Sequence, residues 1–227
     1  MSEYKKFVII GMGAFGKAIA RTLKDLNADI TIIDKKLSII EDLKKEGFEH
    51  AVQLDSTNED ALSQFVTADD LVVLSMGKSF EDNILSIGIL MKFGVTKIYT
   101  RAIKEIQMKI FDKMDVVETL FPEKQHGQET AIKLFYDGIQ FVKEFAPGIY
   151  LGEFKIPKKY CNKTIIELAI RQKYDINIIA LKESNESDGT IKTIYSTNFG
   201  NVLLKENDTL IAVGTKKSIS SFLENEG

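Results

Sequence analysis

The residues best placed to do chemistry form a glycine-rich loop near the start of the chain. Gly11, Gly13 and Gly16 follow the spacing G-x-G-x-x-G, and the residues between them are Met12, Ala14 and Phe15. In such a loop the first glycine permits a tight turn, the second lets backbone N–H groups approach a phosphate, and the third allows close helix–strand packing. Downstream, the Asp34 carboxylate is placed to accept hydrogen bonds from a ribose. We therefore expect residues 11–16, Asp34 and the adjacent Lys35 to bind a nucleotide cofactor.

A phosphate loop of this kind needs a strand before it and a helix after it, and the sequence predicts both. Phe7–Ile10 is an apolar run that leads directly into the loop, and a helical pattern follows. A second apolar run, Ile30–Ile33, ends at Asp34. The glycine spacing alone is a weak signal, but the order strand, glycine turn, helix, strand and acid makes it a strong one. The helix N-terminus adds partial positive charge for the phosphate.

The first 120 residues alternate between strand-like and helix-like segments, which predicts a parallel sheet with helices on both faces. The expected strands are Lys6–Ile10, Asp29–Ile33, His50–Leu54, Leu71–Ser75, Lys97–Thr100 and Val116–Leu120. The expected helices lie near 14–26, 37–46, 58–65, 80–93 and 103–113. Six strands in this order predict a complete Rossmann-type, doubly wound α/β domain.

The pattern changes after Phe121, and all 3 prolines of the chain fall beyond it. A helical run crosses 123–136, and residues 145–157 are expected to form a boundary or linker. The rest predicts a smaller α+β lobe with strands at Tyr150–Ile156, Ile176–Leu181, Thr190–Tyr195 and Thr209–Val213, a turn at 184–189, and helices at Thr164–Tyr174 and Lys216–Leu223. We expect a nucleotide-binding domain over 1–137, crossover helix included, and a regulatory domain over 138–227.

Further polar residues follow the predicted strands, at the edge of the sheet where open α/β folds bind ligands. They are Asp55, Ser56 and Thr57 after the third strand, Gly77 and Asn83 after the fourth, Arg101 after the fifth and Glu123 after the sixth. Each has a simpler role open to it, as a helix cap or as one half of a surface ion pair. As a set, these residues favour an adenine nucleotide as the ligand.

The composition limits the remaining classes of function. A formal net charge of −3 with both signs dispersed gives no basis for a nucleic-acid partner. The two histidines, His50 and His126, and the single cysteine, Cys161, have no recognisable catalytic partner. No apolar run approaches the roughly 20 residues that span a bilayer. We expect a soluble, cytoplasmic nucleotide sensor without catalytic activity, and any membrane role would come through a partner.

Several segments together resemble one known family. They are Gly-Met-Gly-Ala-Phe-Gly at 11–16, Ile33-Asp34, Leu54-Asp55-Ser56-Thr57, Gly77 with Asn83, Phe121-Pro122-Glu123-Lys124, and in the second part 162–168, Arg171, Tyr174, 207–210 and Val213-Gly214. This arrangement resembles the cytoplasmic regulatory subunits of Ktr and Trk potassium-uptake systems, the RCK-domain family. The resemblance covers nearly the whole chain and is closest to the Ktr branch.

The resemblance implies a ring of dimers, commonly an octamer, on the inner face of the cell membrane beneath a potassium-translocating subunit (KtrB- or TrkH-like). ATP would favour the open channel and ADP the closed one. Asp34 and Asp55 would contact ribose and adenine, and Arg101 the phosphates or a neighbouring subunit. Glu123 would approach the nucleotide or an accompanying divalent or monovalent cation. Some members bind cyclic di-AMP in the C-terminal lobe, and by position that site would involve Ile165, Ile166, Ala169 and Arg171.

One departure from the family pattern leaves the nucleotide open. ATP-selective Ktr-type members commonly carry arginine where this chain has Ala14. Without that arginine, either the discrimination of ATP from ADP falls or Lys17, Lys78 or Arg101 substitutes for it, and NAD(H) becomes an alternative to ATP and ADP. Two other readings share the glycine loop and Asp34, namely a small NAD-dependent oxidoreductase and a Trk-like NAD(H) sensor. A redox-sensing repressor is the weakest reading, because the sequence shows no basic recognition helix.

Overall fold

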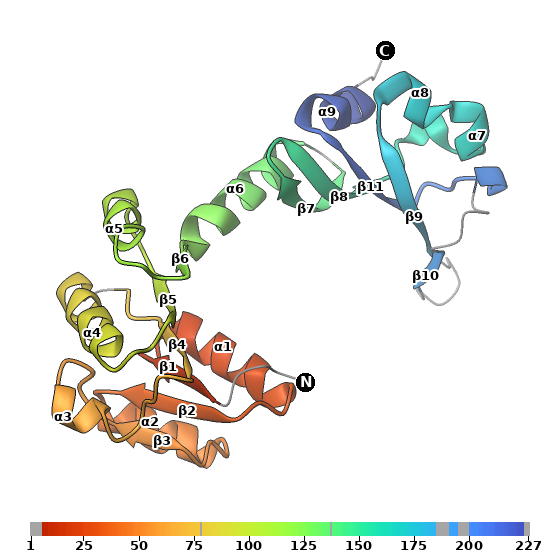
Figure 1. Cartoon of the computed structure of the whole chain (residues 1–227). Helices are drawn as coiled ribbons and strands as arrows, with labels where there is room; N and C mark the ends of the chain where they lie inside the picture. Colours follow the sequence, from red (N-terminus) through yellow and green to blue (C-terminus); the bar gives the residue numbers. More distant parts are fainter. Residues whose placement is uncertain (1–5, 78, 137, 185–190, 195–199, 225–227) are drawn as a thin grey trace. The chain divides into compact units, whose positions relative to one another are not determined.

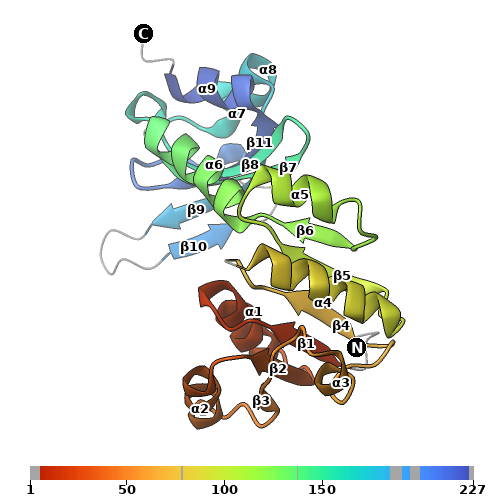
Figure 2. The same ribbon diagram turned by 90° about the vertical axis from the view of Figure 1, so that its left-hand side faces the viewer.

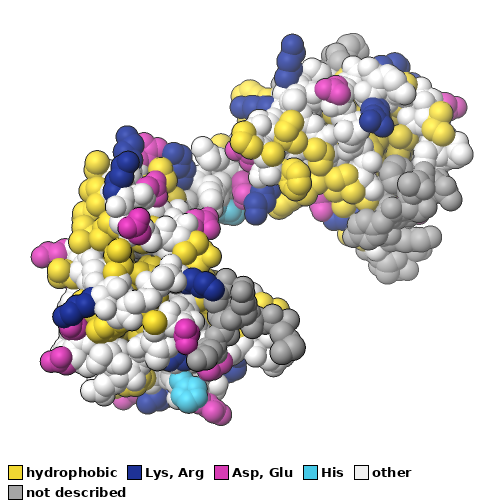
Figure 3. All heavy atoms as spheres, viewed as in Figure 1, with side chains coloured by type: hydrophobic (Ala, Val, Ile, Leu, Met, Phe, Trp, Pro, Cys, Tyr) yellow, Lys and Arg dark blue, Asp and Glu magenta, His cyan; other side chains and the backbone are white. Residues whose placement is uncertain are grey.

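The computed structural model describes residues 6–77, 79–136, 138–184, 191–194 and 200–224. The chain divides into two compact units, Met1–Glu123 and Lys124–Gly227. Figure 1 shows the elements of each unit, coloured along the sequence. The helix that was expected to close the first domain at residue 137 is grouped from Lys124 onward with the second unit. On the face drawn in Figure 3, basic and acidic side chains are interspersed among the described residues of both units.

The first unit is built on a six-stranded sheet in the order β3-β2-β1-β4-β5-β6, and every pair of neighbours is parallel. Its strands are β1 (Phe7–Ile10), β2 (Ile30–Asp34), β3 (Ala51–Gln53), β4 (Leu71–Leu74), β5 (Lys97–Arg101) and β6 (Glu118–Leu120). The strand order reverses between β1 and β4. This confirms the predicted doubly wound fold, in which ligands bind at the reversal point beyond the carboxyl ends of the strands.

Helices cover both faces of this sheet, as Figure 2 shows for α1 and α2 on one side and α4 and α5 on the other. The helices are α1 (Ala14–Asp25), α2 (Leu37–Lys45), α3 (Glu59–Leu62), α4 (Phe80–Lys92), α5 (Glu105–Phe111) and the start of α6 (Pro122–Phe135). Because side chains alternate across a strand, Val8 and Ile10 pack with α3, α4 and α5, whereas Ile9 packs with α1 and α2. Burial on both faces explains why the parallel strands read as continuous apolar runs.

The second unit is an antiparallel sheet with short helices. The strand order is β10-β9-β11-β8-β7, with antiparallel pairing throughout the described strands. Its elements after α6 are β7 (Ile139–Ala146), β8 (Ile149–Lys155), the 3₁₀ helix η1 (Lys158–Tyr160), α7 (Ile165–Leu168), α8 (Ile170–Tyr174), β9 (Asn177–Ser184), β10 (Ile191–Ile194), β11 (Thr209–Thr215) and α9 (Lys216–Glu224). The core gathers around Phe154, Leu181, Leu210 and Phe222. The predicted α+β lobe is confirmed.

Two local predictions for the second unit were wrong. Residues 145–157 are not a linker, because β7 and β8 pair as a hairpin whose turn contains Pro147 and Gly148. Gly148 has a φ of 75°, a backbone conformation that is common in tight turns and that glycine adopts without strain. The single helix expected over 164–174 is also interrupted, since Ala169 lies in the left-handed region with φ 48° and separates α7 from α8. The expected turn at 184–189 lies, except for Ser184, outside the described residues.

Candidate functional site

A pocket of about 750 Å³ opens at the carboxyl edge of the parallel sheet. Its lining comes from the ends of β1, β2 and β5, the glycine loop, the segments after β3 and β4, and the starts of α1, α2, α4 and α6. The lining residues are Ile10, Gly11, Met12, Gly13, Ala14, Asp34, Lys35, Lys36, Ile39, Leu54, Asp55, Ser56, Ser75, Met76, Gly77, Ser79, Asp82, Arg101, Ile103 and Glu123. Eleven of the fifteen residues expected from the sequence to bind the nucleotide therefore share one cavity.

The three loop glycines have different surroundings, which define different roles. Gly11 has a φ of +92°, and a Cβ there would lie 2.5 Å from Cγ of Met76. A Cβ on Gly16 would overlap the Gly11 carbonyl oxygen and the Ser75 hydroxyl, so this glycine joins α1 to the sheet. A Cβ on Gly13, the N-cap of α1, would meet nothing within 4 Å. The open space therefore lies over Gly13, at the helix terminus suited to an anion.

Asp34 ties the end of β2 to the glycine loop. Its Oδ2 accepts a hydrogen bond from the Met12 N–H at 2.6 Å, and its Oδ1 accepts one from the Lys36 N–H at 2.9 Å. A carboxylate offers about four lone-pair sites, so two of them remain for hydroxyl donors of a ligand. The side chain is partly buried and lines the pocket. This geometry suits the ribose contact that the sequence predicts.

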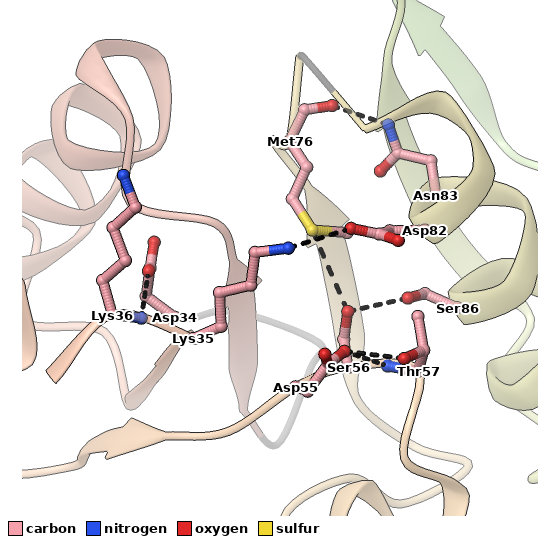
Figure 4. Close-up of polar contacts among 10 residues, drawn as sticks. All are labelled: Asp34, Lys35, Lys36, Asp55, Ser56, Thr57, Met76, Asp82, Asn83 and Ser86. Atoms are coloured by element: carbon pink, nitrogen blue, oxygen red, sulfur yellow. Dashed lines mark hydrogen bonds and ion pairs between the residues drawn. The ribbon is translucent and has the colours of Figure 1, made fainter.

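The segment after β3 is held by hydrogen bonds of its own side chains (Figure 4). Asp55 Oδ1 accepts from the Thr57 hydroxyl at 2.7 Å and from the Thr57 N–H at 3.0 Å. These two hydrogen bonds hold the pKa of Asp55 below its ordinary value of 3.8. The buried Ser56 hydroxyl shares a 2.7 Å hydrogen bond with Ser86 of α4. Asp55 and Ser56 line the pocket, whereas Thr57 acts on it through Asp55.

A side chain of α4 holds the segment after β4 in position. Asn83 is 1% exposed and its Nδ2 donates to the Met76 carbonyl at 2.6 Å. Asn83 thus supports the pocket wall and is not itself among the lining residues. Its neighbour Asp82 does line the pocket and pairs with Lys35 at 3.2 Å. Figure 4 shows these two side chains reaching toward each other from α4 and from the loop after β2.

Arg101 and Glu123 meet at the end of the pocket that contains Gly77. The Arg101 side chain is 16% exposed and forms an ion pair with Glu123, the second residue of α6. The guanidinium carbon lies 5.3 Å from the centre of the Phe15 ring. Burial lowers the pKa of Arg101 from its ordinary 12.5, and a guanidinium still stays charged at neutral pH. Phe15 does not line the pocket and instead supports Arg101.

The remaining expected residues lie elsewhere or act indirectly. Gly16, Phe15, Thr57 and Asn83 surround the pocket without lining it. Lys17 is not among the lining residues either, and Lys78 lies outside the described residues. The lining residues outside the fifteen that were expected to bind the nucleotide are Ile10, Lys36, Ile39, Leu54, Ser75, Met76, Ser79, Asp82 and Ile103. Ser75 and Met76 directly follow β4, so their place at the strand end was the available signal.

The residues expected to hold a second ligand lie in the second unit. Ile165 and Ile166 belong to α7, Ala169 separates α7 from α8, and Arg171 lies on α8. Ile166 is 64% exposed and Arg171 is also exposed. Glu123, the residue expected near a cation, is paired with Arg101, and the described residues contain no group of three or more His, Cys, Asp or Glu side chains that could hold a metal.

Across the described part of the chain, none of the helices combines the length and apolar character that crossing a bilayer requires.

Comparison with known proteins places these features in one family. The TrkA-N domain model matches residues 7–122, and the TrkA-C domain model matches residues 151–227. The Ktr system potassium uptake proteins C and A of Bacillus subtilis (strain 168) are 26% and 25% identical to this chain, over 96% and 98% of its length and 96% and 97% of theirs.

The fold is also found among solved structures. The GsuK RCK domain superposes with a TM-score of 0.66 at 16% identity and covers 100% of this chain. This chain spans 49% of that one, about half its length. The likeness agrees with the two-unit architecture, and the TrkA-N match alone spans more than half of the 227 residues. The chain therefore belongs to the family of proteins that join a TrkA-N domain to a TrkA-C domain.

Proposed function

We propose that this protein is a nucleotide-controlled regulatory subunit of a Ktr- or Trk-type potassium-uptake system. The observation that carries the proposal is the pocket itself, which joins the open space over Gly13 to Asp34 and Arg101 at the reversal point of the sheet. The potassium uptake proteins of Bacillus subtilis are similar to this chain over nearly its full length. The pocket supplies a site for a ligand, and the relatives indicate what that ligand controls.

The pocket offers complementary groups to each part of an adenine nucleotide. Backbone N–H groups at the start of α1 would hold phosphate, where the first turn of the helix contains no acidic residue. Asp34 would accept from the ribose hydroxyls, and its charge would disfavour a 2′-phosphate. The apolar side chains of Ile39 and Leu54, with Asp55 and Ser56 beside them, would surround the base.

ATP and ADP are the leading ligands, with NAD(H) as the alternative. A small NAD-dependent oxidoreductase would use the same glycine loop and the same carboxylate. The ionisable side chains among the described lining residues are Asp34, Lys35, Lys36, Asp55, Asp82, Arg101 and Glu123. Several of these already hold structural hydrogen bonds or ion pairs. We therefore favour a sensor, which needs only differential binding, over an enzyme.

Regulation would operate through a shift in populations. A ligand changes a conformational equilibrium only to the extent that it binds one conformation more tightly than another.

The protein would act from the cytoplasmic side as a ring of dimers, commonly an octamer, beneath a potassium-translocating subunit of the KtrB or TrkH kind. Cyclic di-AMP is the proposed second ligand, at Ile165, Ile166, Ala169 and Arg171 of the second unit. An accompanying cation near Glu123 belongs to the same proposal.

A thermal-shift panel on the pure protein tests the nucleotide site first, with ATP, ADP, NAD⁺, NADH and cyclic di-AMP. A ligand at 100 times its dissociation constant stabilises the folded protein by about 2.7 kcal/mol, which raises the melting temperature measurably. We expect shifts with ATP and ADP. A shift with NADH alone would favour the redox sensor or the dehydrogenase, and hydride-transfer assays would separate those two.

Asp34→Ala is the matched variant for this panel. We expect it to weaken every adenine nucleotide, because the ribose acceptor is lost together with the hydrogen bond to Met12 N–H. Asp60→Ala, an exposed carboxylate on α3 outside the pocket lining, is the control and should leave the shifts unchanged. Unaltered nucleotide binding by Asp34→Ala would place the site elsewhere. Copurification with a potassium-translocating membrane subunit tests the partner.

A further inference from the structure

The peptide group that joins Gly11 to Met12 is held from two sides. Its carbonyl oxygen accepts a hydrogen bond from the Ser75 hydroxyl, and its N–H donates to Oδ2 of Asp34 at 2.6 Å. The C=O and N–H of a planar trans peptide point in opposite directions, so bonds to both of them fix the rotation of the whole plane. Gly11 has no Cβ to restrict the chain here. Two side chains therefore set the orientation of the first peptide of the glycine loop.

The Ser75 hydroxyl reaches this carbonyl from the end of the neighbouring strand. Ser75 directly follows β4, and its N–H donates to the Ile10 carbonyl at 2.9 Å, which extends the pairing of β4 with β1. Ser75 is 2% exposed, so its hydroxyl is shielded from water. On the other side, the Gly11 N–H donates to the Ile33 carbonyl of β2 at 2.8 Å. The start of the loop is thus bonded to both neighbours of β1, at the point where the strand order reverses.

The third glycine of the loop leaves room for this hydrogen bond. A Cβ on Gly16 would overlap both bonded atoms, the Gly11 carbonyl oxygen and the Ser75 hydroxyl oxygen. The first turn of α1 therefore packs directly against the bond between them. Because the site is this closely packed, a carbonyl that lost its donor would pay much of the cost of an unmade hydrogen bond.

The orientation of this peptide affects two parts of the candidate pocket together. Its N–H holds the Asp34 carboxylate, which is the expected ribose acceptor. The open space over Gly13, where phosphate is expected, begins at the residue after Met12. A fixed peptide therefore keeps the ribose acceptor and the phosphate position at a constant separation, as a ligand that carries both groups requires.

We propose that Ser75 is a positioning residue of the nucleotide site, which acts on the ligand through the Gly11–Met12 peptide. The inference rests on the proposed nucleotide site and adds to it a side chain whose effect passes through the backbone. Ser75 and Asp34 act on the same peptide group, so their contributions to binding are coupled. The role is the same for ADP and for NAD⁺, because each carries an adenosine ribose next to phosphate.

Isothermal titration calorimetry of the full chain with adenosine, ADP and NAD⁺ tests this role. In Ser75→Ala we expect ADP and NAD⁺ to bind roughly 3- to 10-fold more weakly, the effect of one lost neutral hydrogen bond. Adenosine should lose less, because it has no phosphate to be aligned with its ribose. Ser63→Ala is the matched control, since it removes a hydroxyl that donates to the Asp60 carbonyl outside the pocket lining. It should bind all three ligands as the unchanged protein does.

Asp34→Ala supplies a readout that a general structural role of Ser75 would not change. When both residues hold one peptide, the first change already frees it, so the double variant should lose less ADP affinity than the product of the two single losses. Hydrogen exchange followed by mass spectrometry gives a second measurement. Deuterium uptake across residues 11–16 should rise in Asp34→Ala and in Ser75→Ala, and stay unchanged in Ser63→Ala.

Several results would overturn the inference and leave the nucleotide site intact. They are unchanged ADP binding by Ser75→Ala, equal losses of adenosine and ADP, and single losses that simply multiply in the double variant. If Ser75→Ala does not fold, exchange in Asp34→Ala decides, and unchanged uptake across residues 11–16 would overturn the shared peptide. Failure of all three ligands to bind the unchanged protein would overturn the proposed function itself, and this inference with it.

Discussion

The two units of this protein present their candidate sites in opposite ways. In the first unit the pocket is enclosed by strand ends, helix starts and the glycine loop, so backbone topology positions most of its walls. In the second unit the expected ligand residues lie on two short helices, α7 and α8, joined at Ala169. Ile166 and Arg171 project from these helices as exposed side chains.

This contrast follows from the two kinds of sheet. A parallel sheet brings the carboxyl ends of its strands to one edge, so residues distant in sequence converge there wherever the sheet forms. Short helices on an antiparallel sheet create no such edge, and a ligand at α7 and α8 would need further surface to enclose it. We therefore expect changes in the pocket of the first unit to affect nucleotide binding, and changes on α7 and α8 to affect the second ligand alone.

The largest expected effect comes from Gly16→Ala, because its Cβ would overlap the Gly11 carbonyl oxygen and the Ser75 hydroxyl. Overpacking of a tight contact costs roughly 1–3 kcal/mol or more of unfolding free energy. Chemical denaturation, followed separately for each unit, measures it. Gly88→Ala is the matched control, since Gly88 is exposed in α4 with nothing within 4 Å of its Cβ position. This variant should gain about 0.5–1 kcal/mol from helix propensity. Equal effects of the two changes would contradict the packing role of Gly16.

Gly13→Val should separate binding from folding at the same loop. Gly13 has φ −68° and ψ −173°, which valine adopts readily, and its Cβ would meet nothing within 4 Å. Stability should therefore change little, whereas the branched side chain would fill the space expected for phosphate. We expect at least about a 10-fold loss of nucleotide affinity, equivalent to about 1.4 kcal/mol, in calorimetric titration. A folded Gly13→Val variant that binds ATP normally would move the phosphate away from α1.

The sequence predicts some features of the first unit and not others. The spacing of Gly11, Gly13 and Gly16 before a helix specifies a local backbone geometry, so the loop, the parallel sheet and the strand-end residues could be predicted. The role of Phe15 could not, because its support of Arg101 depends on the placement of β5 against α1. Asp82 was missed for a similar reason, since its ion pair with Lys35 joins residues 47 positions apart.

In the second unit, two features of the backbone could not be predicted from the sequence. Residues 145–157 were predicted to form a boundary or linker because they contain Pro147 and Gly148, and such residues alone do not distinguish a hairpin turn from a domain boundary. The break between α7 and α8 was missed because Ala169 is an excellent helix former. Ala169 nevertheless has φ 48° and ψ 42°, a left-handed conformation that its helix propensity does not predict.

Arg171→Ala, a change in the second unit, tests whether the two candidate sites bind their ligands independently. If cyclic di-AMP binds at α7 and α8, loss of this exposed cation should weaken it by roughly 10-fold, because hydrogen bonds from arginine to phosphate are charge-assisted. Binding of ATP and ADP should stay unchanged. Lys173→Ala removes a neighbouring exposed cation from the same helix and serves as the control. Equal losses in both variants would indicate general electrostatic attraction, and a change in ATP affinity would contradict the independence of the two sites.

The smallest expected effect concerns Thr57, which acts on the pocket only through Asp55. Its hydroxyl and N–H hold the pKa of Asp55 below 3.8, so in Thr57→Val that pKa should rise toward its ordinary value. Because a depressed carboxyl pKa stabilises the fold only while the group is ionised, the wild type should exceed Thr57→Val in stability above about pH 4. The excess should disappear as the pH falls through the pKa of the folded state. NMR titration of the Asp55 carboxyl measures its pKa, and denaturation between neutral and acidic pH measures the stability difference.

Thr22→Val, which removes an exposed hydroxyl bonded to the Ala18 carbonyl, is the control and should show a stability difference from the wild type that is independent of pH. A Thr57→Val difference that persists unchanged in acid would mean that Thr57 stabilises the segment by packing and not through the charge of Asp55.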